Sequence, residues 1–151
     1  MNLVYHFLHA RNTQSLEPGS VLFKEDDAVG PMYVLLEGAA RILVGGHVVE
    51  MAGPGTLLGE MALVDDLPRS ATVVAIAPCR VLPIGRAEFD LLVREKPQFA
   101  RHVMKVLVHR LRRMNELFSE MKAAQREAGE LFRTQHARKW RAPQVDDTIP
   151  M

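Results

Sequence analysis

Three residue types that bind sugar phosphates stand close together within residues 58–73. Gly59 has no side chain, so a ligand can approach the backbone N–H groups around it. Glu60 is a carboxylate, which accepts hydrogen bonds from hydroxyls such as those of a ribose. Arg69 carries a planar, permanently charged fork that matches a phosphate. If Glu60–Leu63 forms a helical turn, its first N–H groups also attract an anion. Together these groups suit a sugar phosphate; the alternative is that Arg69 is an ordinary surface residue and that the Gly59-Glu60 pair has no special role.

The order and spacing of these residues resemble the phosphate-binding cassette of the cyclic nucleotide-binding domain family. This family includes protein kinase A regulatory subunits, the catabolite activator protein and cyclic nucleotide-gated channels. The matching cassette motifs are Gly59-Glu60, Ala62-Leu63, Pro68-Arg69 and Ser70-Ala71-Thr72. Upstream motifs resemble the family's opening strands and the turn before its cassette, at Pro18-Gly19, Phe23-Lys24-Glu25, Asp27, Met32-Tyr33-Val34, Glu37-Gly38 and Gly53-Pro54-Gly55. The resemblance covers residues 16–118 and is to a stand-alone sensor domain without a DNA-binding domain.

The resemblance implies a role for each matching residue. Glu60 would hold the ribose 2′-hydroxyl, and Arg69 would pair with the cyclic phosphate. A phosphate with one negative charge needs a desolvated partner to bind tightly. Backbone amides or a hydroxyl would come from Gly59, Ala62 and Ser70, and the same predicted site includes Met61 and Ala71. Because both charged residues are present, we expect a competent site for cyclic AMP, with cyclic GMP as the alternative.

A contact to the base is expected from a long C-terminal helix, around Arg112 and Asn115. The Asn115 amide has the donor and acceptor needed for an adenine or guanine edge. The alternative is that both are ordinary residues of the helix surface. The identity of Ser70 does not decide between the purines, because a hydroxyl at this position occurs in family members that prefer either.

One position departs from the family pattern. Asp26 stands where the family usually has glycine. Aspartate tolerates the left-handed backbone conformation. We therefore expect Asp26 to form the same turn.

Composition narrows the class of protein. The chain has 151 residues, of which 48% are hydrophobic, and this suits one domain with a core. A net charge of +1 argues against a strong overall field for nucleic acid. Cys79, the single cysteine, cannot form an internal disulfide, which fits a reducing cytoplasm. No apolar run approaches the ~20 residues of a membrane span, and no signal peptide is recognisable, so we expect a soluble, cytoplasmic protein with no membrane partner.

The sequence contains no recognisable catalytic constellation. His102 and His109 are seven residues apart, too distant along a helix to share a metal. Among the histidines only His47 falls in the β-region, so a metal-binding roll lacks its ligands. Walker, dinucleotide and nucleophile-elbow motifs do not occur. We expect no enzyme activity, no metal and no cofactor besides the nucleotide ligand.

Short apolar runs punctuated by glycine and proline fill residues 16–84. They predict strands at Val21–Phe23, Met32–Leu36, Ala40–Val44, Val48–Met51, Ala71–Ile76 and Arg80–Ile84. Many short strands at regular spacing indicate a sandwich, barrel or roll. The predicted fold is mainly β with α: an antiparallel β-roll (a double-stranded β-helix, similar to a jelly roll) of about eight strands, flanked by short helices and closed by a long C-terminal helix. The roll would occupy residues 16–96, after an N-terminal helical segment at residues 1–15.

Helical periodicity begins after the last predicted strand. A short helix is expected at Arg86–Arg94, and Pro97 suits the first turn of a long helix over residues 97–133. An apolar seam recurs along it at three- and four-residue steps, at Phe99, Val103, Val106, Leu107, Leu111, Met114, Leu117, Phe118 and Met121. The seam either packs on the chain's own β-domain or pairs with a second chain; we favour a homodimer, because the seam outlasts what a small roll can cover. Residues 134–151 are predicted to form a disordered tail.

These features predict a sensor that signals by repositioning its C-terminal helix toward a partner protein or within a dimer. Two further readings stay open: a nucleic-acid-binding regulator and a ligand-blind interaction module. The last third of the chain is basic, but too few residues follow Gly129 to build a helix-turn-helix domain. DNA binding is therefore not expected, and the effector protein is unidentified.

Overall fold

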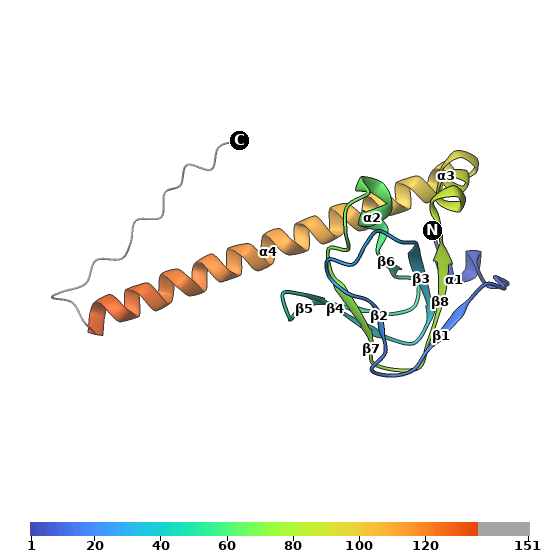
Figure 1. Ribbon diagram of the computed structural model, residues 1–151. Helices are drawn as coiled ribbons and strands as arrows, with labels where there is room; N and C mark the ends of the chain where they lie inside the picture. Colours follow the sequence, from blue (N-terminus) through green and yellow to red (C-terminus); the bar gives the residue numbers. More distant parts are fainter. Residues whose placement is uncertain (136–151) are drawn as a thin grey trace. The chain divides into compact units, whose positions relative to one another are not determined.

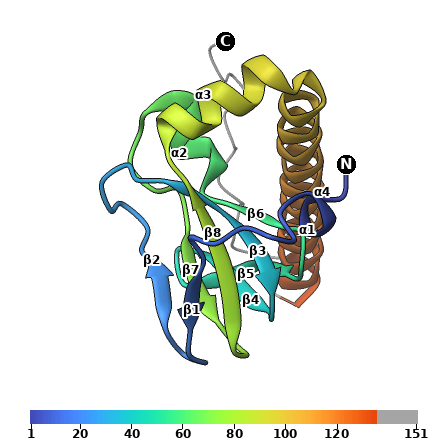
Figure 2. The ribbon, with the colours of Figure 1, turned by 90° about the vertical axis from the view of Figure 1, so that its right-hand side faces the viewer.

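Two antiparallel sheets of four strands each form the β-roll (Figures 1 and 2). The computed structural model describes residues 1–135. The first sheet has the order β1-β8-β3-β6, with bounds Gln14–Leu16, Cys79–Ile84, Met32–Glu37 and Leu57–Leu58. The second has the order β2-β7-β4-β5, with bounds Val21–Phe23, Thr72–Ala75, Ala40–Val44 and His47–Ala52. Together with three short helices and a long C-terminal helix, this confirms the predicted fold class.

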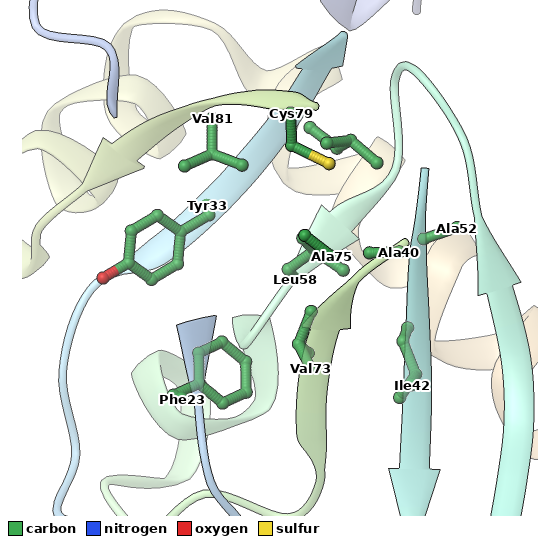
Figure 3. Close-up of a cluster of buried hydrophobic side chains, with 11 residues drawn as sticks. Phe23, Tyr33, Ala40, Ile42, Ala52, Leu58, Val73, Ala75, Cys79 and Val81 are labelled. Carbon is green, nitrogen blue, oxygen red and sulfur yellow. The ribbon is translucent and has the colours of Figure 1, made fainter. Parts of the chain in front are cut away.

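The core between the two sheets draws on strands of both (Figure 3). Its buried members are Phe23, Tyr33, Leu35, Ala40, Ile42, Ala52, Leu58, Val73, Ala75, Cys79 and Val81. Strand β3 is buried on both faces, because successive side chains of a strand point to opposite sides. Tyr33 and Leu35 enter this core, whereas Met32 and Val34 face a second cluster.

The second cluster joins the first sheet to the helices. Helix α1 (Leu3–His6) contributes Leu3, and the beginning of α4 (Pro97–Gln135) contributes Phe99 and Val103. The Phe99 ring is fully buried, and its centroid lies 6.0 Å from that of Phe89 in an edge-on arrangement. Phe89 belongs to α3 (Arg86–Glu95), which precedes α4. The first turns of α4 are therefore part of the folded roll.

The N-terminal segment is less helical than expected. Within residues 1–15, α-helix is limited to Leu3–His6, and Gln14–Leu16 pairs with β8 as strand β1. The residues of β1 show no apolar alternation that identifies a strand, and the pairing with β8 imposes the extended conformation.

The chain divides into two compact units, residues 1–107 and the residues from Val108 onward. In the second unit α4 continues to Gln135, with most of its side chains exposed. Thr134 and Gln135 still belong to α4, and the rest of the predicted tail lies outside the described residues. No helix within residues 1–135 combines the length and apolarity needed to cross a membrane.

Candidate functional site

The predicted cassette residues come together around one short helix. Gly59 caps helix α2 (Glu60–Asp65) in the left-handed conformation, with φ 76°. The Nη1 atom of Arg69 donates to the Gly59 carbonyl at 3.4 Å. Beside it, the Ser70 hydroxyl lies 3.5 Å from the sulfur of Met61. The segment after α2 therefore folds back against the start of the helix.

Arg69 is held inside the roll. Its exposed fraction is 4%, and its Nη2 donates to the Pro31 carbonyl at 2.7 Å. Its guanidinium carbon lies 4.1 Å from the centroid of the Phe23 ring, a cation–π distance. Burial lowers the pKa of Arg69 from its ordinary value, while Tyr33 and Asp27 act in the opposite direction. Arginine stays charged at neutral pH, so the fold holds a buried cation at the cassette.

The backbone of Arg69 is fixed by a neighbouring turn. Its N–H donates to the Asp27 carbonyl at 2.9 Å, and its carbonyl accepts from the Asp26 N–H at 2.9 Å. Asp26 has φ 69°, which is the left-handed conformation expected where the family usually has glycine. The Asp27 carboxylate also accepts from the Lys24 N–H at 2.9 Å. This turn determines where the arginine side chain enters the site.

Glu60 is the other buried charged residue of the cassette. It is the first residue of α2, and its exposed fraction is 1%. The capping residue Gly59 makes no side-chain hydrogen bond to the helix, so no cap side chain covers the first N–H groups of α2. A carboxylate and backbone N–H groups at one helix start are the kinds of acceptor and donor that bind a polar ligand.

The remaining predicted cassette residues differ in exposure. Ala62 is buried, and Ala71 packs against the core between the sheets. Met61 and Ser70 are exposed. Ala62 and Ala71 therefore pack toward the interior of the domain, whereas Met61 and Ser70 lie at its surface.

Three residues that position Arg69 were not predicted as site residues. Phe23 lies against the guanidinium, and Pro31 accepts its hydrogen bond. A Cβ at Gly30 would lie 2.8 Å from Nη2 of Arg69, so the arginine occupies the space that a side chain there would need. The Gly30-Pro31 pair reads in the sequence only as a turn, and these contacts span 38 residues or more, which no local pattern reveals.

Gly59→Ala is expected to destabilise the protein by more than about 2 kcal/mol and to weaken ligand binding. Left-handed backbone costs a non-glycine residue about 1–2 kcal/mol. In addition, the new Cβ would lie 3.2 Å from the Phe23 ring and in contact with the Arg69 guanidinium, which must then move. Thermal unfolding and a ligand titration measure the two effects.

Two glycine controls separate these causes. Gly45 shares the positive φ, 57°, but a Cβ there meets nothing within 4 Å, and Gly53 has neither feature. Gly45→Ala should show the backbone cost alone, and Gly53→Ala should be near neutral. Equal effects of the Gly45 and Gly59 substitutions would contradict the close packing of Arg69 on Gly59.

The predicted base-contact residues are both exposed residues of α4. Arg112 and Asn115 belong to the unit that begins at Val108. Their contact with a base stays a prediction. Elsewhere in the described part of the chain, no three His, Cys, Asp or Glu side chains gather as metal ligands do.

A β-roll with a buried arginine and a buried glutamate around a short glycine-capped helix defines a domain suited to a small phosphate ester. The family model described as "Cyclic nucleotide-binding domain" matches residues 13–96, which is more than half of the chain. The chain belongs to this family. It is therefore a cyclic nucleotide-binding regulatory domain.

Relatives and solved structures of similar sequence agree with this assignment. The Cyclic AMP receptor protein of Thermus thermophilus is 32% identical over 99 residues, covering 62% of this chain and 46% of the relative. A cAMP-dependent protein kinase regulatory subunit of Hypocrea atroviridis is 34% identical over 84 residues, covering 56% of this chain and 18% of the relative. The chain thus spans less than half the length of these relatives.

The structural neighbours show the same fold. The crystal structure of Thermus thermophilus Catabolite Activator Protein has a TM-score of 0.64 at 28% identity, covering 73% of this chain and 54% of that one. The structure of Sp-2Cl-cAMPS bound to PKAR CBD2 has a TM-score of 0.58 at 27% identity, covering 70% of each chain.

Proposed function

We propose that this chain is a sensor that binds cyclic AMP at the cassette and has no catalytic activity of its own. The observation that carries the proposal is the burial of two charged residues at the start of one short helix: Glu60 is the first residue of α2, and Arg69 donates to the carbonyl of Gly59 just before it. Arg69 pairs with the cyclic phosphate and Glu60 accepts from the ribose 2′-hydroxyl. The N–H groups at the start of α2, with Met61, Ala62, Ser70 and Ala71 around them, complete the site.

The charge of Arg69 suits this role. A guanidinium has five N–H donors, and its bonds to Pro31 and Gly59 use two of them. Those bonds and the Phe23 ring hold the fork in place before the ligand arrives, which lowers the ordering cost of binding. The buried cation also gains a counter-ion when the phosphate binds.

The choice of cyclic AMP rests on the relatives. Among them are a Cyclic AMP receptor protein and cAMP-dependent kinase regulatory subunits, and one neighbour is titled "cAMP bound PfPKA-R (141-441)". A cGMP-dependent protein kinase of Toxoplasma gondii is 36% identical over 77 residues, so cyclic GMP is the second candidate.

A displacement assay tests which purine is preferred. A fluorescent cyclic AMP analogue is bound to the protein and displaced with cyclic AMP, cyclic GMP or non-cyclic 5′-AMP. Cyclic AMP should displace it at the lowest concentration and 5′-AMP at the highest. If cyclic GMP displaces the analogue at a lower concentration than cyclic AMP does, the preferred ligand is cyclic GMP. The same assay on Asn115→Ala and Arg112→Ala tests the proposed base contact.

We also propose that the second unit pairs with a second copy of the chain. Exposed apolar residues recur along α4 in a heptad pattern, with Leu111 and Phe118 at one position and Met114 and Met121 at the other. Their exposed fractions lie between 46% and 62%. A seam of this spacing is buried when two helices form a left-handed coiled coil.

Met114→Glu combined with Phe118→Glu is expected to convert the dimer to a monomer. Two carboxylates in each helix would meet their copies inside an apolar seam, where unpaired charges are strongly disfavoured. Analytical ultracentrifugation measures the outcome, and Arg126→Glu on the outer face of the helix is the control. A native chain that sediments as a monomer would contradict this part of the proposal.

Signalling would proceed by a ligand-dependent shift of α4 toward an unidentified effector protein. A ligand can move such an equilibrium only through its different affinities for the two positions. Hydrogen exchange of α4 with and without cyclic AMP tests this, and unchanged exchange opposes it. A cytoplasmic location suits Cys79, which is free, buried and bonded to the Ala39 carbonyl at 3.2 Å.

A further inference from the structure

A polar cavity lies away from the cassette, against helix α1 and the first turns of α4. Its volume is about 470 Å³, within the range of small-molecule sites. All its lining residues fall within residues 1–107, and none belongs to the cassette.

The cavity is lined by basic side chains from both helices. Arg101, His102 and Lys105 stand on one face of α4, because residues three and four apart are neighbours on a helix. His6 faces them from α1. None of the described residues that line the cavity is Asp or Glu, and neither Arg101 nor Lys105 forms a salt bridge to a described residue. The lining therefore concentrates positive charge without compensating it.

The surroundings reinforce this charge. The Lys96 ammonium lies 3.1 Å from Nε2 of His6, and since an ammonium has no acceptor, the imidazole nitrogen accepts. Burial and Lys96 lower the pKa of His6, and burial, the N-terminal ammonium and Lys105 lower the pKa of His102. Both imidazoles are therefore neutral at neutral pH, and the positive charge of the lining belongs to Arg101 and Lys105. The first turn of α4 holds no acidic residue, so the positive end of its dipole is not offset there.

We propose that this cavity is a second anion site, which takes a multiply charged phosphate group of a small molecule. The guanidinium of Arg101 and the ammonium of Lys105 supply charge-assisted hydrogen bonds to several phosphate oxygens. Tyr5, which is 78% exposed and also lines the cavity, offers a flat face to an organic part of the ligand. The site is independent of the cyclic nucleotide proposed for the cassette.

Calorimetric titration of the full chain at low ionic strength tests the site, with inorganic tripolyphosphate and then ATP as probes. Low salt limits screening of exposed charges. Both probes should bind, with ATP the tighter if Tyr5 contacts its base. The double variant Arg101→Glu, Lys105→Glu should bind both at least about tenfold more weakly, because two charge-assisted hydrogen bonds are lost. Both positions are exposed, so the thermal unfolding midpoint of the variant should equal that of the native chain.

Two further variants make the result specific. Arg126→Glu, which makes one such charge reversal farther along α4, should leave the affinity nearly unchanged. Arg69→Ala should also retain tripolyphosphate binding, since the cassette is not involved. The proposal is overturned if tripolyphosphate fails to bind, if the double variant binds normally, or if Arg69→Ala alone abolishes binding. The last result would place the anion in the cassette.

Discussion

Replacing Arg69 with alanine is expected to weaken cyclic AMP binding by between about 30-fold and several thousand-fold. Truncating one member of a buried, hydrogen-bonded charge pair costs about 2–5 kcal/mol in affinity. Arg69 meets the conditions for such a value, because it is buried and its guanidinium is fixed by Pro31, Gly59 and the Phe23 ring. Calorimetry of the variant with cyclic AMP measures the loss.

The same substitution also tests the fold, so its control must separate the two effects. Alanine removes the donor from two backbone carbonyls and leaves a void beside Phe23, which should cost about 1–3 kcal/mol of stability. Arg69→Lys retains the charge but not the planar fork, and it should restore part of the affinity. Arg80→Ala, which breaks a surface ion pair with Glu37, should change neither property much. Native affinity in a folded Arg69→Ala variant would show that Arg69 does not pair with the phosphate.

Replacing Glu60 with alanine is expected to weaken cyclic AMP binding by about 10- to 150-fold. A hydrogen bond to a charged group contributes about 1.5–3 kcal/mol, and the buried position of Glu60 keeps water from replacing the ribose hydroxyl. Competition titrations measure the loss, and Glu60→Gln, which keeps an acceptor without the charge, should lose less.

A ligand lacking the 2′-hydroxyl makes this test specific. For the native protein, 2′-deoxy cyclic AMP should bind more weakly than cyclic AMP by a factor close to that of the Glu60→Ala change. In Glu60→Ala itself the two ligands should bind almost equally, because the contact has already been removed. If the deoxy ligand loses the same factor in both proteins, Glu60 does not contact that hydroxyl.

Much of the roll could be predicted because its strands carry their own signals. Val21–Phe23 and Ala40–Val44 have the bounds that their apolar runs predicted. The other predicted strands shift by one residue at one or both ends. Two strands were not predicted. Gln14–Leu16 begins with two exposed polar residues, and Leu57–Leu58 has only two residues. Each becomes a strand by pairing with β8 or β3, a long-range event that no short window of sequence contains.

The cassette, like the roll, could be predicted from the sequence only in part. Gly59, Glu60 and Arg69 stand within eleven residues of one another, and their order and spacing resemble the cassette of a known family, which is what predicted a joint site. The residues that hold Arg69 in place come from elsewhere: Phe23 from β2 and Pro31 from the turn before β3. Their contacts depend on the closure of the roll and were invisible in the sequence. The turn at Asp26 was predictable, because left-handed backbone is a local property of that residue type.

The most direct test of the central claim is isothermal titration calorimetry of the native chain with cyclic AMP. The protein must first be shown to be folded and free of nucleotide. The account predicts one binding event per chain at micromolar concentration or tighter, with weaker binding of cyclic GMP. An absence of binding by either nucleotide to folded, nucleotide-free protein would contradict it, and the function would then have to be sought in the partner of α4.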